Sequence, residues 1–258
     1  LPQVTEEVIR GIQENYDLIV TNFANGDVIG HTSNDEAKIK CASIVDEHLG
    51  RVLDVALAND YVVFVTADHG NLEEMRNTDG TAHVAHTTNP VKSVLIDSHL
   101  EKDLTLRDGR LADVAPTVLS ALGLSQPEDM TGHSLVSTHD WGGKRRVLLV
   151  ILDGWGSGQE SDINPIFLAN TPRWNDLIRS WPNSQLAASG EAVGLKAGKT
   201  GNSEAGHLNL GAGRVVMQDD VRLDMAMQDG AFHINEVFLK TIQEVKERGK
   251  NLHLIGLL

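Results

Sequence analysis

The sequence predicts an α/β fold in which a mostly parallel sheet is flanked by helices. Three apolar runs, at residues 16–23, 61–67 and 146–152, are rich in Val, Ile, Leu and Phe. Runs this apolar are typical of parallel strands that are buried on both faces. Helical patterns separate the runs, as the crossover connections of a parallel sheet require. The chain has 258 residues, of which 41% are hydrophobic, so it can bury a sizeable core.

The hydrophobic pattern predicts the remaining elements in chain order. We expect helices at residues 6–15, 35–59, 112–123 and 235–249, and a further strand at residues 93–97. A helix-like stretch also runs from Ser203 to Leu210, after a glycine-containing segment. The single cysteine, Cys41, lies in the second helix and is expected to be a packing residue. One cysteine cannot form an internal disulfide, which favours a reducing cytoplasm.

Acidic residues follow three of the predicted strands. Asp27, Asp68 and Asp153 each come at or shortly after the end of an apolar run. In open α/β sheets the ligand site lies beyond the carboxyl ends of the strands. A single Asp in this position is usually a turn residue or a helix cap. Three such acids in one sheet favour a shared site instead.

Three histidines, His31, His69 and His86, stand close to these acids or in neighbouring loops. Carboxylates and imidazoles together are suitable ligands for Mn, Zn, Co or Mg, and the mixed set favours Mn or Zn over an all-oxygen Mg site. Two close metals can polarise a phosphoryl group and activate a hydroxyl as a nucleophile. We therefore expect two divalent metal ions, with Mn preferred, and no organic cofactor.

Ser203 is the candidate nucleophile. It begins a helix-like stretch, so backbone N–H groups beside it can receive a phosphate. The alternative is that Ser203 is only the N-cap of this helix, with Glu204 in the first turn. His207 lies four residues further on, on the same helix face, where a structural hydrogen bond and a role in the site are both open.

Five segments of the sequence, residues 22–32, 66–71, 85–90, 152–156 and 201–214, closely resemble the family of cofactor-independent phosphoglycerate mutases. This family belongs to the alkaline phosphatase superfamily, and the resemblance covers nearly the whole chain. It implies an alkaline-phosphatase-like fold and a glycolytic enzyme that interconverts 3-phosphoglycerate and 2-phosphoglycerate through a phosphoserine intermediate. An isomerase of this kind acts on a small phosphorylated substrate.

The resemblance also implies a role for each matched residue. Ser203 matches the phosphorylated nucleophile of the family, and Asn202 matches a residue that contacts the phosphate. One metal would be held by the residues Asp27, His31 and His86. The other would be held by the residues Asp153, Ser203, Asp68 and His69.

The motifs stand in permuted order relative to the family. Residues 1–135 match the carboxyl-terminal half of the phosphatase-type domain, and residues 145–216 match its amino-terminal half, which bears the nucleophile. Residues 136–144 are expected to be a linker, because they are polar and contain glycine. Residues 217–258 match the start of an inserted transferase domain, whose substrate-gripping part is largely absent. A stand-alone metal-dependent phosphomonoesterase and a non-catalytic fragment that keeps the metal site therefore stay open as alternatives.

Charge and hydropathy exclude other classes of partner. The formal net charge is −14, and the sequence has no basic face that would suit a nucleic acid backbone. No apolar run is long enough to span a bilayer. We expect a cytoplasmic monomer that binds neither nucleic acid nor membrane.

Overall fold

The computed structural model describes residues 1–100, 104–136 and 139–255. The chain divides into two compact units, Leu1–Val216 and Met217–Leu258. The first unit contains the sheet and every candidate site residue.

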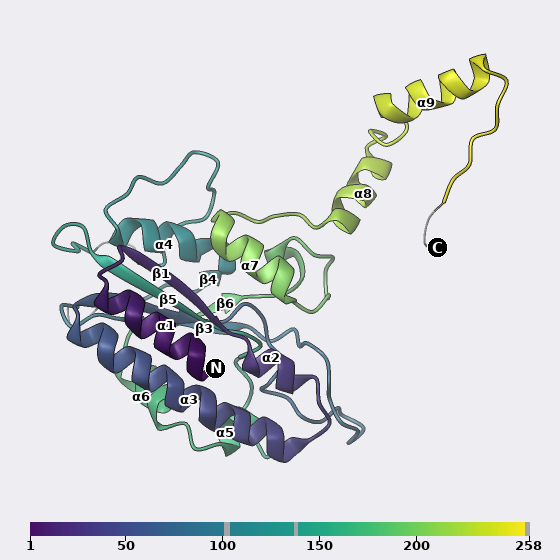
Figure 1. The fold of residues 1–258 in the computed structure, drawn as a ribbon. Coiled ribbons are helices and arrows are strands. Elements are labelled where there is room, and N and C mark those ends of the chain that lie inside the picture. The colour runs from purple at the N-terminus through teal and green to yellow at the C-terminus, as the bar shows by residue number, and fades with distance from the viewer. Residues whose placement is uncertain (101–103, 137–138, 256–258) are drawn as a thin grey trace. The chain divides into compact units, whose positions relative to one another are not determined.

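A six-stranded sheet forms the centre of the first unit (Figure 1). Its strands are β1 (Leu18–Phe23), β2 (Tyr61–Thr66), β3 (Val91–Ile96), β4 (Gly109–Arg110), β5 (Arg146–Leu152) and β6 (Asn183–Ala187). Across the sheet their order is β1-β5-β2-β3-β6-β4. β1 and β2 both pair with β5 in parallel, and β4 pairs with β6 in parallel. β3 is antiparallel to both of its neighbours, so it alone among the described strands runs against the rest. The prediction of a mostly parallel sheet is confirmed.

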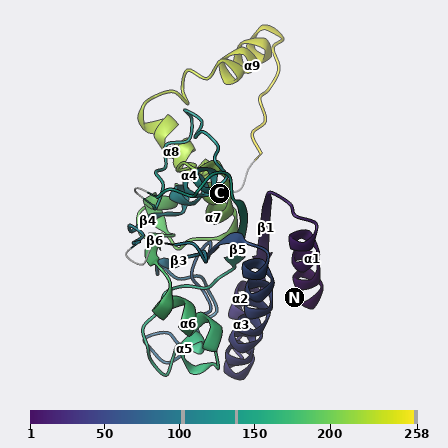
Figure 2. The ribbon, with the colours of Figure 1, turned by 90° about the vertical axis from the view of Figure 1, so that its left-hand side faces the viewer.

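Helices cover both faces of this sheet. They are α1 (Pro2–Gln13), α2 (Asn25–Gly30), α3 (Asp35–Ala58), α4 (Val114–Ala121), α5 (Pro165–Leu168), α6 (Pro172–Ser180) and α7 (Ser203–Ala212), with 3-10 turns at Leu111–Asp113 and Gly190–Val193. In Figure 1, α1 and α3 lie on one side of the strands and α4 and α7 on the other. α3 packs against α1, β2, α5 and α6, whereas α4 packs against β5 and α7. Figure 2 shows α1 beside the edge strand β1.

The core follows the apolar runs of the sequence, with one exception. All six residues of β2 are buried, and so are the last six of β5. β1 was expected to be buried on both faces, but Leu18 and Val20 are exposed. The reason is its position, because β1 pairs with β5 on one side and forms the edge of the sheet.

Several elements have no counterpart in the predicted set. β6 reads Asn-Ser-Gln-Leu-Ala, which is too short and polar to stand out as a strand. α2 and α6 are also absent from the prediction, and the predicted helix at residues 112–123 is a 3-10 turn followed by α4. Cys41 is buried in α3, as expected of a packing residue.

The second unit contains α8 (Asp219–Gln228) and α9 (Glu236–Glu247), neither of which has a buried residue. The predicted helix at residues 235–249 corresponds to α9. Of the expected linker at residues 136–144, residues 137 and 138 lie outside the described part of the chain. Within the described part, no helix is both long enough and apolar enough to cross a membrane.

Candidate metal centre

The direction of the strands brings the candidate ligands to one edge of the sheet. Asp153 directly follows β5, Asp68 lies two residues beyond β2, and Asp27 lies on α2 just beyond β1. Because β5 pairs in parallel with both β1 and β2, all three carboxyl ends point the same way. β3 runs in the opposite direction, so the loop that precedes it ends at this same edge and carries His86.

Asp27, His31 and His86 form the first cluster. Asp27 and His31 are one helical turn apart, and His31 Nε2 lies 3.3 Å from Asp27 Oδ1. His86 Nε2 lies 3.1 Å from the same oxygen and 3.1 Å from His31 Nε2. The other ring nitrogens are bonded to backbone carbonyls, His31 Nδ1 to Val84 O and His86 Nδ1 to Gly201 O, each at 2.8 Å. These carbonyl acceptors hold a proton on Nδ1, so each Nε2 can offer its lone pair when a metal takes the place of the contact with Asp27.

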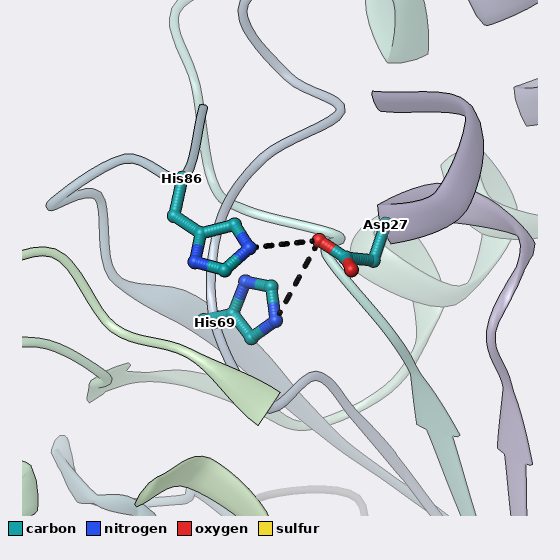
Figure 3. A group of neighbouring side chains, drawn as sticks. All are labelled: Asp27, His69 and His86. Atoms are coloured by element: carbon teal, nitrogen blue, oxygen red, sulfur yellow. Dashed lines mark ion pairs between the residues drawn. The ribbon is translucent and has the colours of Figure 1, made fainter. Parts of the chain in front are cut away.

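The second cluster gathers around His69, whose side chain is fully buried. Its Nε2 lies 3.0 Å from Ser203 Oγ, 3.3 Å from Asp153 Oδ1 and 3.5 Å from Asp68 Oδ2. Ser203 Oγ also donates to Asp153 Oδ1 at 3.2 Å. His69 Nε2 is 3.8 Å from Asp27 Oδ1, so the two clusters adjoin at this ring (Figure 3).

Two asparagine amides orient the acids. Asn71 Nδ2 donates to Asp27 Oδ1 at 2.8 Å, and Asn22 Nδ2 donates to Asp153 Oδ2 at 2.7 Å. Hydrogen bonds of this kind fix the direction of a ligating carboxylate. Sequence reasoning did not assign these roles, although both residues lie within the matched segments 22–32 and 66–71. The available signal was their position in the chain, with Asn22 at the end of an apolar run and Asn71 three residues after Asp68.

The electrostatics of the cluster favour charged groups. Burial by itself would raise the pKa of Asp27, but hydrogen bonds from His86 and Asn71 outweigh it and hold the pKa well below its ordinary value. The pKa of Asp153 is lowered, against the effect of burial, by hydrogen bonds from His69 and Asn22. Burial would lower the pKa of His69, yet its hydrogen bond to Asp153 and the charge of Asp68 raise that pKa to about 9. In the metal-free protein these shifts favour the ionised carboxylates of Asp27 and Asp153 and a proton on His69.

The arrangement fits divalent cations. Asp68 Oδ2 is buried and accepts no well-aligned hydrogen bond from the described residues, although His207 Nδ1 lies 3.2 Å away. A buried carboxylate oxygen without a partner is costly, and a cation beside it would remove that cost. Among the described residues, three groups of acids and histidines have ligand atoms that all lie within 4.8 Å of one another, and two of them belong to this site: Asp27 with His69 and His86, and Asp68 with Asp153 and His207.

His207 belongs to the second of these groups. Its Nδ1 lies 2.8 Å from Ser203 O and 3.2 Å from Asp68 Oδ2, and the nearness of the Asp68 carboxylate is the main cause of its raised pKa. The sequence left open whether His207 makes a structural hydrogen bond or takes part in the site. The structure shows the backbone contact and also places the ring beside a candidate ligand.

Ser203 is the first residue of α7 and is not its N-cap. The cap is Asn202, whose Oδ1 accepts a hydrogen bond from Ala205 N at 2.9 Å. The alternative reading of Ser203 as a cap is therefore wrong, and its hydroxyl is left to contact His69 and Asp153. The expected contact of Asn202 with a phosphate stays a prediction, for which its Nδ2 group is the available donor.

Fold and site together define an α/β protein suited to holding divalent metal ions at the carboxyl edge of its sheet. The chain belongs to the Metalloenzyme superfamily, because the model of that family matches residues 1–126 and 145–250. The expectation of an alkaline-phosphatase-like α/β fold agrees with this membership.

Several curated relatives, which all carry the same protein name, match about half of the chain. A 2,3-bisphosphoglycerate-independent phosphoglycerate mutase of Flavobacterium johnsoniae is 51% identical over 120 residues, which are 46% of this chain and 23% of that protein. A protein of the same name, numbered 2, from Methanosarcina barkeri is 48% identical over 136 residues, or 52% of this chain and 26% of its own length. A protein of this name from Clostridium acetobutylicum is 47% identical over 135 residues, which are 52% of this chain and 26% of that protein. The matched region thus spans about a quarter of each of these relatives.

Proposed function

We propose that this chain carries the metal site and the nucleophile of a cofactor-independent phosphoglycerate mutase, a glycolytic isomerase that interconverts 3-phosphoglycerate and 2-phosphoglycerate. The names of the relatives support this reaction. The observation that carries the proposal is the position of Ser203 Oγ, 3.0 Å from His69 Nε2 and 3.2 Å from Asp153 Oδ1, at the start of α7. A hydroxyl at a helix N-terminus among metal-binding side chains is suited to phosphoryl transfer.

In this proposal two metal ions are held by the side chains of the two clusters. Asp27, His31 and His86 would hold one ion. Asp153, Ser203, Asp68 and His69 would hold the other. We take Mn²⁺ as the preferred ion; ligands that mix carboxylate oxygen and imidazole nitrogen suit Mn or Zn. When bound, such ions supply positive charge that polarises a phosphoryl group and lowers the pKa of the serine hydroxyl.

The residues of the chain then account for each half of the reaction. Ser203 Oγ attacks the phosphorus, its proton leaves toward Asp153 Oδ1, and the bond from phosphorus to the glycerate oxygen breaks. The released glycerate oxygen takes up the proton that Ser203 gave to Asp153, so the step consumes no other acid or base. Ala205 N is capped by Asn202 Oδ1, which leaves the N–H groups of Ser203 and Glu204 in the first turn of α7 to bind the phosphoryl oxygens, with Asn202 Nδ2 as a further donor. The second half transfers the group from Ser203 to the other glycerate hydroxyl by the same steps in reverse.

Further parts of the proposal concern the chain as a whole. We assign residues 1–135 and 145–216 to the two halves of a phosphatase-type domain, and residues 217–258 to the start of an inserted transferase domain. We further propose that the protein is cytoplasmic and monomeric. The lone Cys41 is buried, and burial raises the pKa of its thiol to about 11, in keeping with a packing residue.

The test is to look for phosphate on Ser203. After incubation with Mn²⁺ and 3-phosphoglycerate, mass spectrometry should find a phosphoserine at this position, and Ser203→Ala should remove both the adduct and turnover. Ser180→Ala is the matched control, because Ser180 lies on α6 and bonds to Asp176. Release of 2-phosphoglycerate supports the mutase. Release of inorganic phosphate with free glycerate supports a phosphomonoesterase, and no phosphoserine under any metal condition supports a non-catalytic fragment.

A further inference from the structure

Glu73 is a buried carboxylate in the loop that follows β2. It is 1% exposed, and it is not one of the candidate metal ligands. A buried acid of this kind needs hydrogen-bond donors on both oxygens. The structure provides four of them.

The four donors come from three segments of the chain. Glu73 Oε2 accepts from Asn71 N at 2.8 Å and from Gly156 N at 3.0 Å. Glu73 Oε1 accepts from Thr87 Oγ1 at 2.5 Å and from Asn89 Nδ2 at 3.0 Å. Hydrogen bonds to an ionised acceptor are stronger than those between neutral groups.

Each of these segments carries a candidate ligand. Asn71 stands two residues after His69, Thr87 directly follows His86, and Gly156 stands three residues after Asp153. One carboxylate therefore connects the loops that present ligands from both clusters.

The backbone is shaped around this side chain. A Cβ atom at Gly156 would lie 2.2 Å from Glu73 Cδ, and one at Gly70 would lie 2.4 Å from Glu73 Oε1. Neither glycine could carry a side chain without displacing the carboxylate. Thr87 N also donates to Gly70 O at 2.9 Å, so two of the loops are joined directly beside it.

We propose that Glu73 is a positioning residue that sets the spacing of His69, His86 and Asp153 for metal binding. The inference rests on the proposed function, since it assumes that these side chains bind metal. Substituting Glu73 leaves buried N–H and O–H donors without an acceptor, so the loops separate or shift. Loss of such supporting contacts typically weakens metal affinity by about 10- to 100-fold.

Glu73→Gln in the full chain is the first test, because it keeps the size of the side chain and removes the charge and one acceptor. Calorimetric titration with Mn²⁺ should give a Kd about 10- to 100-fold higher than that of the wild type. Amide hydrogen exchange at Asn71 and Gly156 should be faster in the metal-free variant. Glu74→Gln is the matched control, because Glu74 is the adjacent acid and shares the Asn89 Nδ2 donor, which keeps its bond to Glu73 Oε1 when Glu74 is changed; the Kd of this variant should stay at the wild-type value.

The outcomes separate this inference from the function on which it rests. A folded Glu73→Gln protein whose Kd stays within about twofold of the wild-type value would overturn the positioning role, because loss of a merely structural contact lowers stability without changing the affinity of the folded state. If Glu73→Gln does not fold, Thr87→Val is the second test, because it removes one donor to Glu73 beside His86. This variant should bind Mn²⁺ more weakly at one of its two sites. Unchanged affinity at both sites would refute the inference. Wild-type protein that binds no Mn²⁺ would overturn the proposed function, and this inference with it.

Discussion

Removal of the metal ions should lower the melting temperature of the first unit by a predictable amount. An ion that binds only the folded state, present at 100 times its Kd, adds about 2.7 kcal/mol, so two ions add about 5.4 kcal/mol. The unit Leu1–Val216 should have an unfolding entropy of about 450 cal/mol/K, from about 2.1 cal/mol/K per residue. Dividing the free energy of about 5.4 kcal/mol by this entropy predicts a fall in Tm of about 12 °C when both ions are removed by a chelator.

Scanning calorimetry in Mn²⁺ buffer, repeated after addition of a chelator, measures this change. Metal analysis of the dialysed protein should find about two ions per chain. The double variant Asp27→Asn, Asp68→Asn is the control, because it removes one acid from each cluster and should melt at a temperature that the chelator no longer affects. A chelator effect below about 3 °C at saturating Mn²⁺, or less than one ion per chain, would refute the two-metal reasoning.

Two further predictions concern pH and packing. Because the pKa of His69 is raised from 6.5 to about 9, its proton stabilises the metal-free fold below pH 6.5, and this contribution is lost as the pH rises through about 9. Because Mn²⁺ must displace that proton, the affinity of the protein for Mn²⁺ should rise about tenfold per pH unit up to about pH 9. Calorimetric titration at several pH values measures this affinity. A constant affinity between about pH 6.5 and 8.5 would contradict the prediction. Asp46→Ala removes the acceptor of Arg173 N and Trp174 N in the first turn of α6, at 3.1 and 2.6 Å, and should lower the free energy of unfolding by about 1–2 kcal/mol in urea titration. An unchanged urea midpoint would show that this cap contributes nothing.

The apolar runs predicted the central strands, because a strand buried on both faces has a strong local signature. β2 and β5 each carry such a run and lie inside the sheet. The edge position of β1 could not be read from its sequence, since it depends on which strands pair with it. The short strand β6 was missed because its five residues are mostly polar, and even Ser184, which is buried in the sheet, carries a hydroxyl.

The candidate ligands were also predictable to a large extent. The spacing of Asp27 and His31 is that of one helical turn, and Asp68 and Asp153 come at strand ends. Their convergence follows from the parallel pairing of the strands. The cap of α7 was harder to predict, because Asn202 and Ser203 are neighbours that both favour capping positions. Their backbone conformation decided it, with Asn202 extended and Ser203 helical.

The sequence by itself determined the fold class and the types of side chain available for metal binding, because both depend on hydrophobic periodicity and on the chemistry of single residues. Tertiary structure alone decided how those side chains are held. Glu73 and Glu74 are adjacent acids that share the Asn89 amide as a donor, yet Glu73 also accepts hydrogen bonds from Gly156 and Thr87. The physical reason is that a carboxylate takes its role from the donors that surround it, and the Gly156 donor to Glu73 lies 83 residues away along the chain.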